Sequence, residues 1–175
     1  MDLLDIGHFQ FVTGLLEFSA GLHAGFALTD SFRILPKKEF DQYRNNQSKH
    51  PIIKEAGVDA VPFKHPDLEK WRDALHAGIQ YHHKKTNLII TGAVDDLWIS
   101  SAGELIVVDY KATAKTGKVS IDAEWQIGYR RQVEIYQWLL RKNGFNVSNI
   151  AYFVYCNADT SKNSFDQSLH FTIHL

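Results

Sequence analysis

The stretch Gly92-Ala-Val-Asp-Asp-Leu-Trp-Ile-Ser-Ser-Ala-Gly-Glu-Leu-Ile-Val-Val-Asp-Tyr-Lys111 decides the fold, because it reads as two strands joined by a tight turn. Residues 88–99 and 104–112 are rich in Val, Ile, Leu and aromatic residues, which favour strands. Residues 101–103 then form a three-residue hairpin loop, in which Gly103 takes the left-handed conformation that closes it. This loop pairs residues whose numbers sum to 204.

The predicted register brings two carboxylates together. Asp95 lies directly opposite Asp109, and Lys111 points to the same face because side chains alternate along a strand. Like charges in this position destabilise a hairpin, whereas a hard divalent cation such as Mg²⁺ or Mn²⁺ would relieve the repulsion. The Lys111 ammonium could then act on a water molecule or stabilise charge that builds up on a phosphate. The arrangement predicts metal-assisted phosphodiester hydrolysis.

A plainer interpretation of the same residues stays open. Asp95 and Asp96 could begin a turn, and Lys111 could pair with Asp109 at the surface. A register slip by one residue would also move Asp95 to the other face of the sheet. The carboxylate that the turn places opposite Asp95 favours the functional interpretation.

The composition sets limits on the class of protein. With 175 residues, the chain is predicted to form one domain, residues 1–175. Its net charge of −1 means that any basic surface must be local. Cys156 is the only cysteine, which excludes an internal disulfide and an iron–sulfur cluster held by four cysteines. The sequence has no signal-peptide pattern and no apolar run of membrane-spanning length, so we expect a cytoplasmic protein with no membrane partner.

Hydrophobic spacing predicts the remaining elements. Helices are expected over residues 36–47, 68–82 and 124–142, strands over 149–157 and 168–175, and an irregular connection over 50–65. The adjacent His82 and His83 are interpreted as a solvated helix end, and His170 and His174 are given no metal role. Strand, crossover helix and strand in this order predict an α/β fold with a mixed β-sheet flanked by helices.

The helix predicted after the hairpin carries further candidates. Its apolar stripe runs through Trp125, Tyr129, Val133, Tyr136 and Leu140, while Arg130, Glu134, Gln137 and Arg141 form the solvated face. Gln132 falls inside the stripe, where it either bonds to neighbouring backbone or holds the lysine, a ligand or a scissile phosphate. Basic residues near this helix, among them Lys115 and Arg131, are candidates for contacts with a nucleic-acid backbone, although the arginines could equally solvate the helix.

Three ordered motifs carry a family resemblance. Gly92-Ala-Val-Asp95, Val107-Val-Asp-Tyr-Lys111 and Gln132-Val-Glu-Ile-Tyr136 resemble the PD-(D/E)XK nuclease superfamily, and most of all its RecB-like branch, which includes CRISPR-associated exonucleases and small stand-alone bacterial relatives. The match covers residues 85–157 best, and residues 1–35 match poorly.

The resemblance implies a restriction-endonuclease-like core that hydrolyses DNA, in an exonuclease-like manner, with Mg²⁺ or Mn²⁺ and without an iron–sulfur cluster. Asp95, Asp109 and the carbonyl of Tyr110 would bind the metal, and Lys111 would act on the water and the transition state. Gln132 and Tyr136 would shape the site and touch the nucleic-acid backbone. Processive action would require a partner such as a helicase or another repair protein.

One departure from the family pattern leaves an alternative open. RecB-like enzymes usually add a metal ligand from an upstream helix, and Glu39 is the candidate by position. If that ligand is missing, the chain would be a non-catalytic nucleic-acid-binding or assembly domain that retains the nuclease fold. A metal-dependent hydrolase of small molecules is a third, weaker interpretation.

Overall fold

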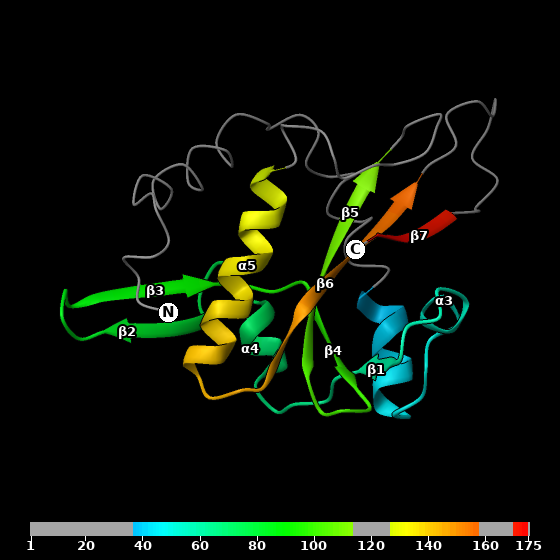
Figure 1. Ribbon diagram of the computed structural model, residues 1–175, viewed down its shortest axis with the longest axis horizontal. Coiled ribbons are helices and arrows are strands. Elements are labelled where there is room, and N and C mark those ends of the chain that lie inside the picture. Colours follow the sequence, from blue (N-terminus) through cyan, green and yellow to red (C-terminus); the bar gives the residue numbers. More distant parts are fainter. Residues whose placement is uncertain (1–36, 114–126, 158–169, 175) are drawn as a thin grey trace.

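In the computed structural model, residues 37–113, 127–157 and 170–174 are described (Figure 1). A helix covers residues 37–45. It is followed by α3 (Pro51–Glu55), β1 (Ala60–Pro62), α4 (Leu68–Arg72), β2 (Ile79–His83), β3 (Leu88–Gly92), β4 (Asp96–Ser100), β5 (Leu105–Thr113), α5 (Ile127–Lys142), β6 (Val147–Asn157) and β7 (His170–His174). Within these ranges, no helix is both long enough and apolar enough to cross a membrane.

The main sheet is mixed and has five strands in the order β1-β4-β5-β6-β7. The β5–β6 pair is parallel, and the other three pairs are antiparallel. The parallel pair follows from the connection, because two parallel neighbours need a crossover and α5 lies between β5 and β6 in the chain. The predicted mixed α/β sheet with helices packed against it is confirmed.

The predicted hairpin is confirmed in its turn and its register. Asp96 pairs with Val108 and Leu97 pairs with Val107, so partner numbers sum to 204 as expected. Gly103 has a φ of 76°, and its N–H donates to the carbonyl of Ser100 at 2.9 Å. A residue with a β-carbon would be strained at this φ, so the turn depends on glycine.

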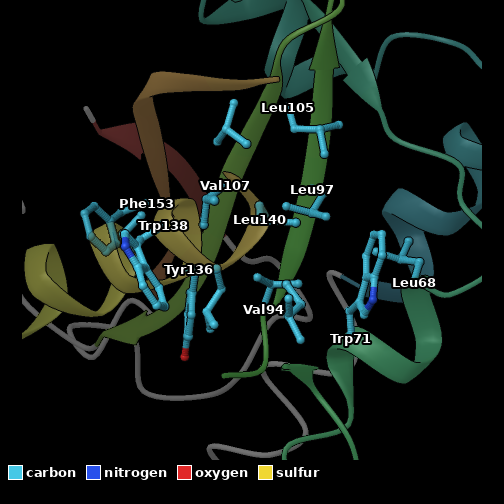
Figure 2. Packing of buried hydrophobic residues seen from close by; sticks show 14 of the residues in the cluster. Leu68, Trp71, Val94, Leu97, Leu105, Val107, Tyr136, Trp138, Leu140 and Phe153 are labelled. Carbon is cyan, nitrogen blue, oxygen red and sulfur yellow. The ribbon is translucent and has the colours of Figure 1, made fainter. Parts of the chain in front are cut away.

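Two apolar clusters cover the two faces of the main sheet. On the α5 side, Leu97 and Val107 pack against Tyr136, Leu139 and Leu140, and Figure 2 shows α4 side chains at the edge of this cluster. The other face is covered by the helix over residues 37–45 and by α3. Its cluster includes Phe40, Ile53, Trp98, Val108 and Tyr110.

Two predicted elements are wrong in the stretch from residue 68 to residue 99. The helix predicted over 68–82 ends at Arg72, and residues 79–83 form β2 instead, so His82 and His83 lie in a strand. Asp73 is already extended, Leu75 is 87% exposed, and Gly78 takes a φ of 81° that a right-handed helix does not contain. The strand predicted over 88–99 is divided, because β3 pairs with β2 in a separate two-stranded sheet.

Smaller differences concern the connection and the long helix. Residues 50–65 contain α3 and β1, so this segment is more regular than predicted. Gln137 of α5 is buried instead of solvated, because its side-chain amide donates to the carbonyls of Ser148 and Ile150. The predicted strands over 149–157 and 168–175 are confirmed as β6 and β7, and β6 is interior to the sheet. Trp125 lies outside the described residues.

Candidate active site

Strand alternation divides the residues at the end of β5 between the two faces of the sheet. Val107 belongs to the cluster on the α5 side, whereas Val108 and Tyr110 belong to the cluster on the other side. Asp109 and Lys111 share the parity of Val107, so they project toward α5. Asp109 is only 1% exposed, which makes it a buried carboxylate on the sheet face that α5 covers.

Asp95 lies one residue before β4, just beyond the last residue pair of the β4–β5 ladder, Asp96 with Val108. It is 5% exposed. One of its oxygens, Oδ2, accepts a hydrogen bond from the backbone N–H of Tyr110 at 3.1 Å, and Oδ1 lies 3.1 Å from the ammonium of Lys37. The contact with Tyr110 fixes the Asp95 carboxylate beside the β5 segment that carries Asp109.

A chain of polar contacts links Asp109 to α5. The Lys111 ammonium is 2.5 Å from Oδ2 of Asp109 and donates to Oε1 of Gln132 at 3.5 Å. The side-chain amide of Gln132 donates to the hydroxyl of Tyr136 at 2.7 Å. Lys111 also lies 4.2 Å from the centre of the Tyr129 ring, within the range of a cation–π contact. Gln132 therefore contacts the lysine, which was one of the two alternatives predicted for it.

The other predicted site residues lie in different surroundings. Tyr136 is buried, and Arg131 is exposed on α5. Lys115 lies outside the described residues. The exposed carboxylate of Glu39 pairs with His50 at 3.1 Å, while Lys37, two residues earlier on the same helix, reaches Asp95.

Sequence reasoning missed a buried ion network on the opposite face of the sheet. Asp96 is 0% exposed and accepts hydrogen bonds from Arg44 at 2.5 Å and from Arg72 at 2.8 Å. The Tyr110 hydroxyl also donates to it at 2.8 Å. Asp41 binds both arginines from the outer side. Alternation alone placed Asp96 on this face, but no local signal pointed to arginines 52 and 24 residues away.

This network changes the protonation behaviour of its members. Burial lowers the pKa of Arg72, but the charges of Asp96 and Asp41 outweigh that effect and raise its pKa above the ordinary value. Burial and the adjacent Asp96 charge raise the pKa of the Tyr110 phenol well above its usual range. Both residues therefore keep their protons at physiological pH. The backbone of Tyr110, which contacts Asp95, is held from the other face of the sheet by this network.

The donor set fits a hard divalent cation in part. Asp95 and Asp109 supply buried carboxylate oxygens beside the end of β5, and hard oxygen ligands suit Mg²⁺ or Mn²⁺. The Tyr110 carbonyl points toward the same edge as its N–H, because both groups of one strand residue lie on one side of the strand. Among the described residues, no three His, Cys, Asp or Glu side chains cluster as a complete metal site.

Comparison with known proteins gives one match. The family model of the PD-(D/E)XK nuclease superfamily matches residues 22–170, which is most of the chain. No curated protein and no solved structure gave a significant match. The matched segment contains the hairpin, the buried carboxylates and α5.

Proposed function

Because the chain belongs to the PD-(D/E)XK nuclease superfamily, we propose that it hydrolyses DNA phosphodiester bonds with the help of Mg²⁺ or Mn²⁺. The observation that supports this most is a pair of buried carboxylates beside the end of β5: Lys111 contacts Asp109, and Asp95 accepts a hydrogen bond from the backbone N–H of Tyr110, the residue between them. Superfamily membership supports a nucleic-acid substrate in general. The choice of DNA is the proposal.

Asp95, Asp109 and the Tyr110 carbonyl would hold the cation. When bound, a divalent cation lowers the pKa of water and neutralises charge on a phosphate. The protein itself contributes a preformed pair of carboxylates, since the backbone N–H of Tyr110 fixes Asp95 and the Lys111 ammonium fixes Asp109. Such preorganisation avoids an ordering cost when the substrate binds.

Lys111 would stabilise negative charge on the phosphate or orient the attacking water. Gln132 contacts the Lys111 ammonium, and Tyr136 accepts a hydrogen bond from the Gln132 amide, so both α5 residues would position the lysine. Arg131, which is exposed on α5, and Lys115, which lies outside the described residues, would contact the nucleic-acid backbone. The RecB-like character of the three motifs supports an exonuclease-like mode and cooperation with a helicase or another repair protein.

The test is cleavage of end-labelled linear DNA and of circular DNA, each single- and double-stranded, with Mg²⁺, Mn²⁺ or EDTA. Wild type should cut only with metal, and Asp109→Asn and Lys111→Ala should lose cutting. Lys54→Ala, which removes an exposed lysine of α3, is the matched control and should cut normally. Cutting that is restricted to linear substrates would assign exonuclease action. Equal activity in wild type and Lys111→Ala would refute the proposed site.

One observation favours a second candidate, a nucleic-acid-binding or assembly domain that does not cut. The upstream helix supplies Lys37 to Asp95 instead of a carboxylate, and Glu39 pairs with His50. Thermal denaturation separates the two candidates, because a ligand that binds the folded state raises the melting temperature. For a metal-dependent nuclease, Mn²⁺ should raise the melting temperature of wild type but not of Asp109→Asn. For a domain that only binds nucleic acid, DNA should raise the melting temperature and Mn²⁺ should not.

A further inference from the structure

A basic groove lies apart from the candidate site, between the β2–β3 hairpin and the C-terminal half of α5. In Figure 1 this hairpin runs beside α5, on the side away from β5. The groove has a volume of about 240 Å³. Its lining comes from β2, the turn after it and α5, and consists of Tyr81, His82, His83, Lys84, Lys85, Trp138 and Lys142.

The lining is both cationic and aromatic. Three of its seven residues are lysines, and among the described residues that line it there is no carboxylate to neutralise them. Lys142 lies over two rings, 5.6 Å from the centre of Tyr81 and 5.5 Å from the centre of Trp138, and the two rings meet edge to face at 5.2 Å. In a chain with a net charge of −1, this concentration of positive charge is local.

Trp138 connects the groove to the buried core. Its side chain is packed into the α5 cluster and is only 8% exposed, yet it lines the groove. Within the described part of the chain, its indole N–H makes no hydrogen bond. This N–H is itself buried and so is not offered to a ligand; Trp138 contributes to the groove through its ring, over which Lys142 lies.

A solvated run of lysines would explain Lys84 and Lys85 alone. It does not explain why Lys142, some 60 residues later in the chain, lines the same groove together with the rings of Tyr81 and Trp138. Lysine ammonium groups beside aromatic rings are the combination that binds single-stranded nucleic acid, in which the phosphates meet the charges and the bases stack on the rings.

We propose that this groove binds a single-stranded segment of the nucleic-acid substrate, beyond the nucleotides that occupy the candidate active site. The inference rests on the proposed function for its substrate class. Lys142 lies ten residues after Gln132 on α5, which corresponds to roughly 15 Å along the helix axis. A strand with about 3.4 Å per stacked nucleotide needs about four nucleotides to cover that distance. Only longer substrates therefore reach both places.

The first experiment measures binding of a labelled single-stranded 16-nucleotide DNA in EDTA, so that no cutting occurs, at 50 and 200 mM salt. The groove variant combines Lys84→Gln, Lys85→Gln and Lys142→Gln. Each phosphate contact on a single strand contributes about 0.7 to the slope of log affinity against log salt, so three lost contacts reduce the slope by about 2. The fourfold rise in salt should then weaken wild type about 16-fold more than the variant.

A matched control replaces three exposed lysines outside the groove, Lys49, Lys54 and Lys64, and so changes the net charge equally. Its salt slope should equal that of wild type. A second variant, Tyr81→Leu, should weaken binding at least about fivefold if a base stacks on that ring. Melting temperatures establish that each variant is folded.

The inference is overturned if the slope of log affinity against log salt is the same in the groove variant and the matched control. It is also overturned if wild type binds inorganic polyphosphate as tightly as it binds DNA. The cleavage assay separates this result from the proposed function. Groove variants should lose cutting efficiency on 16-nucleotide DNA but not on a 4-nucleotide substrate. If wild type never cuts but binds DNA through the groove, the catalytic proposal fails and the groove stands.

Discussion

The buried carboxylate of Asp96 should dominate the stability of this protein, although the adjacent Asp95 belongs to the candidate site. Asp96 is fully buried between two guanidinium groups whose side chains are 7% and 6% exposed. Asp96→Asn keeps the shape and removes the charge. Breaking a buried ion pair by removing one partner costs about 3–5 kcal/mol. Asp41 still compensates both arginines, so we expect the lower end, about 3 kcal/mol.

The free energy of unfolding is measured by urea denaturation at pH 7.5. The slope of this free energy against urea concentration must be the same in variant and wild type, so that the change reflects stability alone. A loss of about 3 kcal/mol corresponds to a melting temperature lower by about 6–12 °C in a chain of this size. The matched control is Glu69→Gln, because Glu69 contacts the same Arg72 at 3.0 Å but its side chain is 82% exposed. An exposed pair contributes less than about 1 kcal/mol, so this variant should resemble wild type.

The reasoning is wrong if Asp96→Asn and Glu69→Gln lower stability by the same amount, because burial is then not what gives the contact its value. Tyr110→Phe gives a further check. It removes one donor to the Asp96 carboxylate and leaves the two arginines in place, so we expect a smaller loss of about 2 kcal/mol. A larger loss than that of Asp96→Asn would mean that the phenol, and not the ion pair, holds the network together.

Three further predictions concern other parts of the fold. Gly92→Ala should lower the free energy of unfolding, measured in urea, by about 1–3 kcal/mol, because the added β-carbon would lie 2.8 Å from the ring of Tyr136. Gly128→Ala is the control and should not lower it, because a β-carbon there meets nothing within 4 Å. Burial lowers the pKa of His50, so the unfolded state binds the proton more readily than the folded state. The contribution of His50 to the free energy of unfolding should therefore be fully present above about pH 6.5 and decrease below it. His50→Gln should lose this pH dependence. An unchanged pH profile in that variant would contradict the assignment. Lys37→Gln should bind Mn²⁺ about fivefold more tightly than wild type in calorimetry, because the ammonium group that competes with the cation for the Asp95 carboxylate is removed. Weaker Mn²⁺ binding would mean that Lys37 supports the site.

Local sequence alone determined the centre of this fold. The loop with Gly103 fixed the hairpin register, and side-chain alternation then placed Asp109 and Lys111 on the face toward α5 and Asp96 on the face of Tyr110. These features depend on residues that are neighbours in the chain or are paired by one tight turn. Short-range geometry therefore suffices to predict them.

Tertiary structure decided what depends on distant partners. An apolar run over residues 88–99 suits one long strand or two short ones equally, and its division into β3 and β4 depends on β2 as a partner for the first part. The burial of Gln137 required the carbonyls at the start of β6, and the Asp96 network required Arg44 and Arg72 from two other helices. Charges and amides are buried only where the fold supplies their partners, and periodicity in a sequence carries no information about such partners.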